Sequence, residues 1–180
     1  MAEPQAFAPE KLVIGVLSSR PSAWERLSSD LEGLFGPPDY ASEAIPFTFT
    51  DYYDREMGTP IERRFVSCRD LVDPARLADI KLQTNALEDR YREAGRRRVN
   101  LDPGLLCLSR LVLATTKQGA HRIPLRSGIY AEVTLTFEKG GFRPLAWTYP
   151  DYRTERCREI LREIRALYRA AMRPPPSSRH

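Results

Sequence analysis

Histidine, cysteine and long apolar runs are scarce in this chain. Of its two histidines, His180 is terminal, so His121 is the only one that a catalytic triad in the body of the chain could use. The three cysteines Cys68, Cys107 and Cys157 lie far apart with no C-x-x-C pair, which argues against that type of zinc site and favours free thiols. No apolar run approaches the roughly 20 residues that span a bilayer, and no secretory signal pattern is present. We therefore expect a cytoplasmic protein with no membrane partner.

The common nucleotide and hydrolase motifs are also absent. The sequence has no Walker A loop, no G-x-G-x-x-G, no G-x-S-x-G and no H-E-x-x-H. The segment 115–118, Thr-Thr-Lys-Gln, lacks the Asp of a guanine-reading [NT]-K-x-D motif. We therefore expect no specific GTP binding at physiological magnesium.

Length and composition are those of one ordinary globular domain. The 180 residues are 42% hydrophobic and 29% charged, with a net charge of +4. Basic residues alternate with acidic ones along most of the chain, so the sequence shows no clear nucleic-acid footprint. We expect a loose segment at residues 1–10, a single α+β domain at residues 11–173 and a disordered tail at residues 174–180.

The first part of the domain alternates between strand and helix patterns. Ser22 to Glu25 is typical of a capping box, and Asp73-Pro74 is typical of a helix start. Residues 98–106 resemble a strand that Asp102-Pro103-Gly104 interrupts. The expected strands are residues 11–19, 44–49, 62–71 and 98–106, with helices at 22–35 and 73–95. This β-α-β-β-α-β order predicts a ferredoxin-like core.

The second part is rich in strands that short glycine-bearing links join. The expected strands are residues 110–117, 121–125, 129–138 and 142–148, and a final helix follows at 154–172. The predicted fold class is therefore α+β: a ferredoxin-like βαββαβ core extended by antiparallel C-terminal hairpins and a final helix.

Polar side chains of this second part indicate a candidate ligand-binding site. In residues 129–137 the alternation places Tyr130, Glu132, Thr134 and Thr136 on one face, which we expect to be the wetter one. The preceding hairpin brings charged groups to the same face. The candidate site consists of Lys117, His121, Arg122, Tyr130 and Glu132, with Asp102 and Asp51 as further carboxylates.

Each of these residues also has a purely structural explanation. Glu132 opposite a cation is more often a cross-strand ion pair than a catalyst. His121 can serve as a structural hydrogen-bonding group, Asp102-Pro-Gly as a turn, and Asp51 as the end of a strand. Lys117 and Arg122 can be the cations of that ion pair.

Seven segments together resemble the bacterial family called domain of unknown function 4416. They are residues 51–58, 80–88, 99–104, 111–117, 121–122, 128–135 and 147–152. The likeness covers the chain from about Lys11 to Arg173 and implies no activity, because the family carries none that is established. Some members look to have been labelled GTP-binding proteins, a label that the missing phosphate loop does not support here.

Three functions remain open at the level of sequence. The first is a binding domain for an anionic small molecule, nucleotide- or phosphate-bearing, in which Lys117, His121 and Arg122 supply positive charge. The second is a metal-dependent hydrolase or phosphotransferase that uses carboxylates such as Glu132 and Asp102. The third is a protein or RNA interaction domain, for which the arginine-rich final helix is the cue, although its glutamates favour a solvated salt-bridged face.

Overall fold

The computed structural model describes residues 3–173 as one open antiparallel sheet with helices on both faces. The strands are β1 (Glu10–Ser18), β2 (Pro38–Ala41), β3 (Ile45–Pro46), β4 (Glu62–Val72), β5 (Val99–Leu106), β6 (Arg110–Thr115), β7 (Ile123–Pro124), β8 (Tyr130–Glu138) and β9 (Gly141–Pro144). The helices are α1 (Trp24–Phe35), α2 (Asp54–Met57), α3 (Leu77–Arg90) and α4 (Glu155–Ala171). Short 3₁₀ turns precede α1, α3 and α4.

The strand order is β2-β4-β1-β5-β6-β8-β7, and every neighbouring pair is antiparallel. β3 extends the pairing along β4, and β9 pairs with the end of β8. The longest strand contacts are those of β1 with β4 and β5, so β1 lies at the centre of the sheet. The prediction of a mixed, largely antiparallel architecture is confirmed at this level.

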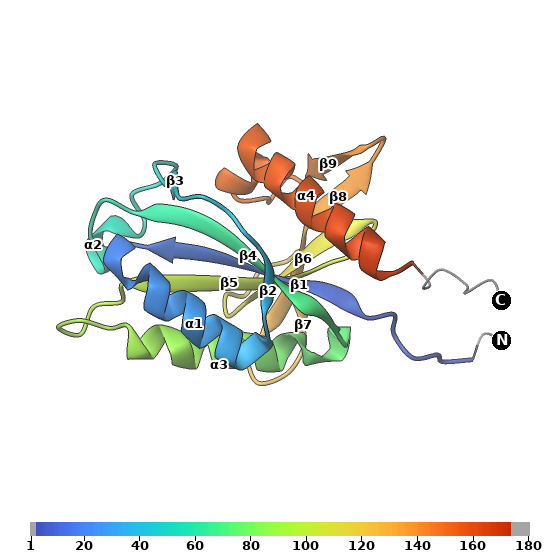
Figure 1. Ribbon diagram of the computed structural model, residues 1–180, viewed down its shortest axis with the longest axis horizontal. Coiled ribbons are helices and arrows are strands. Elements are labelled where there is room, and N and C mark those ends of the chain that lie inside the picture. The colour runs from blue at the N-terminus through green and yellow to red at the C-terminus, as the bar shows by residue number, and fades with distance from the viewer. Residues whose placement is uncertain (1–2, 174–180) are drawn as a thin grey trace, which may run out of the picture.

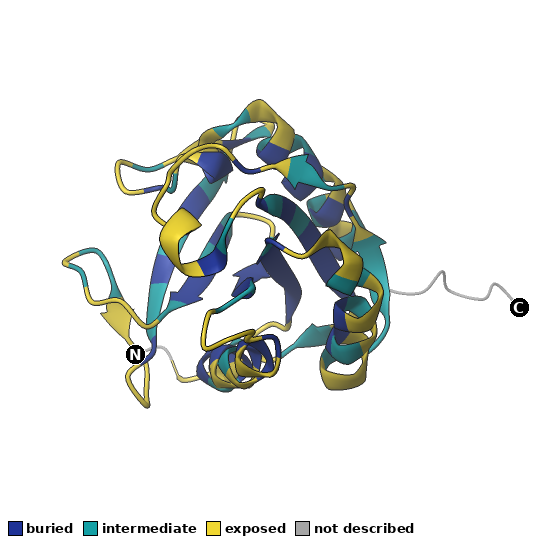
Figure 2. Cartoon of the chain, turned by 90° about the vertical axis from the view of Figure 1, so that its left-hand side faces the viewer, coloured by how far each residue is buried: buried dark blue, intermediate teal, exposed yellow. Residues whose placement is uncertain are grey.

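Helices cover the two faces of the sheet unequally. Helices α1 and α3 lie together on one face, and α4 crosses the other (Figure 1). The first face packs apolar side chains of β1 and β5 against Leu27 and Leu31 of α1 and Leu87 of α3. The second face packs β4, β6 and β8 against α4 residues such as Ile160 and Ile164. Buried residues therefore follow the strands and the inward sides of the helices (Figure 2).

Several expected element boundaries are wrong. The capping box at Ser22 is not formed, because a 3₁₀ turn precedes α1 and no side chain caps it. The second strand lies mainly at 38–41 rather than 44–49, and the strands expected at 121–125 and 142–148 are shorter. Asp73 does cap its helix turn, since its side chain accepts a hydrogen bond from the Ala75 N–H. The final helix is found at Glu155–Ala171, capped by Thr154.

Asp102-Pro103-Gly104 does not interrupt its strand. β5 continues through these residues, because Asp102, Pro103 and Gly104 pair in register with Gly15, Ile14 and Val13 of β1. The interpretation of this tripeptide as a turn is therefore wrong: pairing with the central strand outweighs the local turn preference.

The expected alternation of β8 fails after Glu132. Leu111 pairs with Leu135 and Val112 with Val133, so Thr134 is an extra residue, as in a β-bulge. The bulge places Glu132 and Leu135 on the same face, that of α4. Glu132 was expected on a wetter face, but it is only 1% exposed.

The remaining predictions concern the chain ends, the membrane and the thiols. Residues 3–9 form no helix or strand, and the tail predicted at residues 174–180 lies outside the described residues. Within residues 3–173 no helix has the length and apolar character needed to cross a membrane. Cys68 and Cys157 are buried, Cys107 is half-buried, and all three are free thiols.

Candidate functional site

A cleft forms where β5 and β6 separate. The two strands pair only through Gly104–Leu106 and Leu111–Leu113, and the rest of β5 has no pairing with β6. The cleft has a volume of about 140 Å³ and is lined from the separated strands, from α3 and from the loops at residues 47–53 and 149–152. Its lining includes Leu113, which belongs to the core beneath α4, so the cleft opens on the same face of the sheet as this helix.

Side chains of α3 satisfy the backbone that the separation leaves open. The Leu101 N–H donates to Glu88 Oε1 at 2.7 Å, and the Leu101 carbonyl accepts from Lys81 Nζ at 2.7 Å. Lys81 is 7% exposed, and its Nζ also lies 3.8 Å from Glu88 Oε1. Pro103 has no N–H that would need a partner. The N–H and carbonyl of Leu101 are therefore hydrogen-bonded although β5 and β6 do not pair there.

Arg63 of β4 forms the floor of the cleft between two carboxylates. Its Nη2 donates to Asp151 at 2.6 Å and its Nη1 to Asp102 at 3.1 Å, and the residue is 5% exposed. Burial alone would lower the pKa of Arg63, but the charges of Asp151 and Asp102 outweigh it and raise this pKa. The guanidinium also lies 5.4 Å from the ring centre of Tyr152. The floor therefore carries a permanent cation fixed by two anions.

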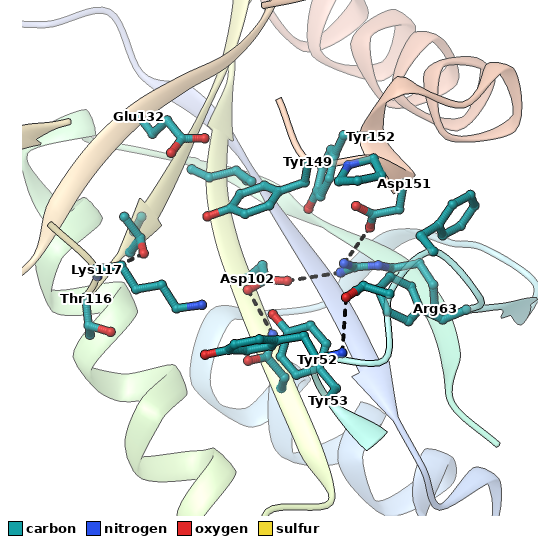
Figure 3. A pocket seen from close by; sticks show the side chains of 18 of the residues that line it. Tyr52, Tyr53, Arg63, Asp102, Thr116, Lys117, Glu132, Tyr149, Asp151 and Tyr152 are labelled. Atoms are coloured by element: carbon teal, nitrogen blue, oxygen red, sulfur yellow. Dashed lines mark hydrogen bonds and ion pairs between the residues drawn. The ribbon is translucent and has the colours of Figure 1, made fainter. Parts of the chain in front are cut away.

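Aromatic side chains make the walls and rim. Tyr149 and Tyr53 lie on opposite sides of Asp102 in Figure 3, while Tyr52, 60% exposed, and Phe49 lie at the entrance. Burial raises the pKa of Tyr53 and of Tyr149, and nearby carboxylates add to the effect. Both phenols therefore stay protonated at neutral pH and can donate a hydrogen bond.

Lys117 differs from the other cations of the cleft. Arg63, Lys81 and Arg97 also line it, and each is ion-paired with a carboxylate. Lys117 Nζ instead lies 4.3 Å from the ring centre of Tyr52, and it has no ion pair with any carboxylate of residues 3–173. Figure 3 shows its side chain pointing into the cleft.

Glu132 holds the cluster that the sequence predicts at the upper wall. Its Oε2 accepts from Arg122 Nε at 2.8 Å and lies 3.0 Å from His121 Nε2. Arg122 also donates to the Tyr149 hydroxyl at 3.0 Å, and His121 stacks on Trp147 with ring centres 5.0 Å apart. Glu132, His121 and Arg122 therefore meet in one network, in which both His121 and Arg122 contact the Glu132 carboxylate.

The other predicted residues have different places. Lys117 is joined to the network through its carbonyl oxygen, which accepts from Arg122, and its ammonium group lies apart. Asp102 lines the cleft and accepts from Arg63 and Asn100. Tyr130 and Asp51 do not line it; Asp51 faces a neighbouring hollow beside Asp54.

Most residues that line the cleft were not among the predicted ones, and Arg63, Lys81, Tyr149 and Asp151 are the polar ones that matter most. Arg63 is followed by Arg64 in a strand, and the sequence does not say which of the two points inward. Lys81 lies in a helix with other polar residues, and the sequence alone does not distinguish it from a solvated one. Tyr149 and Asp151 lie in the aromatic segment 147–152, whose mixture of aromatic and acidic residues was the one available signal.

The structure bears on the two alternative functions as well. Within residues 3–173, no group of three or more His, Cys, Asp or Glu side chains gathers in a way that could hold a metal ion. On α4, Glu155 pairs with Arg158 and Arg162, and Glu159 with Arg156. The arginine-rich helix therefore presents a salt-bridged face, as the glutamates predict.

Comparison with known families gives one match. The family model described as "Domain of unknown function (DUF4416)" matches residues 8–168. The chain belongs to this family. No curated protein and no solved structure matches it. Membership of DUF4416 thus indicates no activity.

Proposed function

We propose that this DUF4416 chain is a small-molecule binding domain whose ligand carries an anionic group, phosphate or carboxylate. The observation that carries the proposal is Lys117, the cleft cation without an ion-pair partner among the described residues. Lys117 is an exposed residue, so its ammonium is accessible to an anion from solvent, and the positively charged lining of a cleft raises the local concentration of anions.

Unused hydrogen-bond donors support the same reading. The Nε atoms of Arg63 and Arg97 are buried and have no hydrogen-bond partner among residues 3–173. Both residues line the cleft. Buried polar groups are rarely left unpaired, and an unsatisfied donor beside a cleft is a common sign of a missing ligand or water.

The size of the cleft limits what it can enclose. An apolar cavity of about 150 Å³ is large enough to take benzene. A cleft of about 140 Å³ therefore encloses one ring or one phosphate-sized group, and a larger ligand must extend past the exposed Tyr52 and Phe49. This favours small monophosphates or carboxylates over dinucleotides.

We also propose that β1, β2, β4 and β5, with α1 and α3, form a ferredoxin-like split unit. The spatial order β2-β4-β1-β5, with both helices on one face, supports this description. In this description, the cleft lies where β5, the last strand of the split unit, separates from β6, the first strand of the C-terminal hairpins.

A thermal-shift screen tests the proposed function. Inorganic phosphate, ribose 5-phosphate, nucleoside monophosphates and short carboxylates are added to the full chain. A ligand at 100 times its Kd adds about 2.7 kcal/mol of stability, which for a domain of this size raises Tm by about 5–10 °C.

Two matched variants locate the effect. Lys117→Gln and Lys139→Gln each remove one positive charge, and Lys139 is an exposed residue in the β8–β9 turn. The shift should vanish in Lys117→Gln and persist in Lys139→Gln. Equal loss in both variants, or no shift with any anion in the parent chain, would refute the proposal.

A further inference from the structure

The charged groups of the cleft divide into two poles. At the floor, the single cation Arg63 faces two carboxylates, Asp102 and Asp151, so this trio carries net negative charge. At the entrance, Lys117 carries an unpaired positive charge among the described residues. An anion makes no use of the two carboxylates at the floor, and these can accept hydrogen bonds from a second part of the ligand.

Asp102 is the member of the trio that a ligand can reach. Asp151 is 5% exposed and turned toward Arg63, whereas the side chain of Asp102 is 25% exposed and lines the cleft. Its Oδ2 accepts from Arg63 Nη1 and its Oδ1 from Asn100 Nδ2 at 2.9 Å. Each carboxylate oxygen can accept a second hydrogen bond, so Asp102 retains acceptor capacity toward the cleft.

The surroundings of Asp102 are flat and aromatic. Tyr149 lies on one side and Tyr53 on the other, and the charge of Asp102 acts on the hydroxyl groups of both tyrosines (Figure 3). Tyr53, Tyr149 and the exposed Tyr52 all line the cleft, and aromatic lining favours a planar ring over a flexible chain, because planar faces stack with little loss of conformational entropy. The volume of about 140 Å³ corresponds to one such ring.

We infer that the cleft binds a planar nitrogen heterocycle of the nucleobase type, with its N–H edge on Asp102 and an anionic substituent on Lys117. The inference rests on the proposed function and specifies its ligand class. A carboxylate accepting from a base N–H is an established recognition pair. A nucleoside monophosphate carries the required elements, an N–H-bearing ring at one end and an anion at the other.

The experiment compares ligands that share the anion and differ in the ring. Calorimetry on the full chain uses GMP, AMP, CMP, UMP and ribose 5-phosphate. At least one nucleotide should bind about tenfold or more tightly than ribose 5-phosphate, the gain expected from a hydrogen bond to a charged group. If no nucleotide exceeds ribose 5-phosphate, the inference fails while the proposed function stands. If neither class binds at millimolar concentration, the inference fails, and the proposed function fails with it when the short carboxylates of the thermal-shift screen give no shift either.

Asp102→Asn locates the ring subsite. The amide keeps the shape and one oxygen acceptor, and Arg63 keeps its ion pair with Asp151. The variant should lose about tenfold or more in affinity for the preferred nucleotide and less than about twofold for ribose 5-phosphate, whose retained binding shows that the cleft is folded. Asp89→Asn, at an exposed site on α3, is the control and should change neither value. Equal losses for both ligands in Asp102→Asn would overturn the inference, and should this variant fail to fold, the ligand comparison on the parent chain decides it.

Discussion

At the scale of single residues, the floor of the cleft depends on an absent side chain. A Cβ on Gly15 would lie 2.6 Å from the Tyr152 hydroxyl and 2.7 Å from Arg63 Nη1. Both atoms belong to buried side chains, and Arg63 is held by two ion pairs. Glycine at this point of the central strand is what lets the guanidinium lie flat on the sheet between its carboxylates.

Gly15→Ala should therefore destabilise the protein by about 1–3 kcal/mol, the usual penalty for overpacking a fitted interior. Urea unfolding at neutral pH measures the change. Gly33→Ala is the matched control, since nothing lies within 4 Å of the added Cβ on the exposed side of α1. That control should gain about 0.5–1 kcal/mol from helix propensity. A Gly15→Ala variant as stable as the parent would contradict this account of the floor.

The sequence predicts the part of the candidate site whose residues are close together in the chain, and it does not predict the part whose residues are far apart. Glu132, His121 and Arg122 meet because two adjoining segments of β8 and its hairpin bring them together, which is a local relation. Arg63 and Asp151 are 88 positions apart and meet only through the sheet. No local sequence pattern indicates such a pair, because the sequence does not distinguish a buried arginine from an exposed one.

At the scale of elements, the separation of β5 from β6 creates the cleft. The presence of a strand follows from alternating apolar and polar residues that turn residues bound, and most strands were predicted in that way. How far two strands stay paired depends on contacts from other elements, here Lys81 and Glu88 of α3 on the Leu101 backbone. The β8 bulge at Thr134 is equally non-local, and one extra residue was enough to reverse the predicted inward and outward faces beyond it.

Lys81→Met tests whether α3 supports the open edge of β5. The change keeps the length of the side chain but removes the donor to the buried Leu101 carbonyl and a charge beside Glu88. The free energy of unfolding should fall by about 1–3 kcal/mol, the penalty for a buried unsatisfied acceptor. Lys139→Met, at an exposed turn, should stay within about 0.5 kcal/mol of the parent. Equal stability of the two variants in urea titrations would show that the Lys81 contact is dispensable.

At the scale of the whole molecule, the sheet uses its two faces differently. One face is closed along its length by α1 and α3. The other is closed by α4 over β4, β6 and β8, and the area that α4 leaves uncovered holds Arg63, Asp102 and Glu132 (Figures 1 and 3). Charged and ion-paired side chains lie there instead of an apolar core, which is the pattern expected of a binding site. We therefore predict that a ligand contacts only the residues that line this cleft.

An NMR titration of the ¹⁵N-labelled chain with a nucleoside monophosphate tests this central claim most directly. The backbone amides of residues 52–53, 100–102, 115–118, 149 and 151–152 should shift on ligand addition, and those of α1 and α4 should not. The same titration of Lys117→Gln should leave the cleft amides unshifted. Saturable shifts centred on α4, or shifts at the cleft that are the same in Lys117→Gln, would contradict the account.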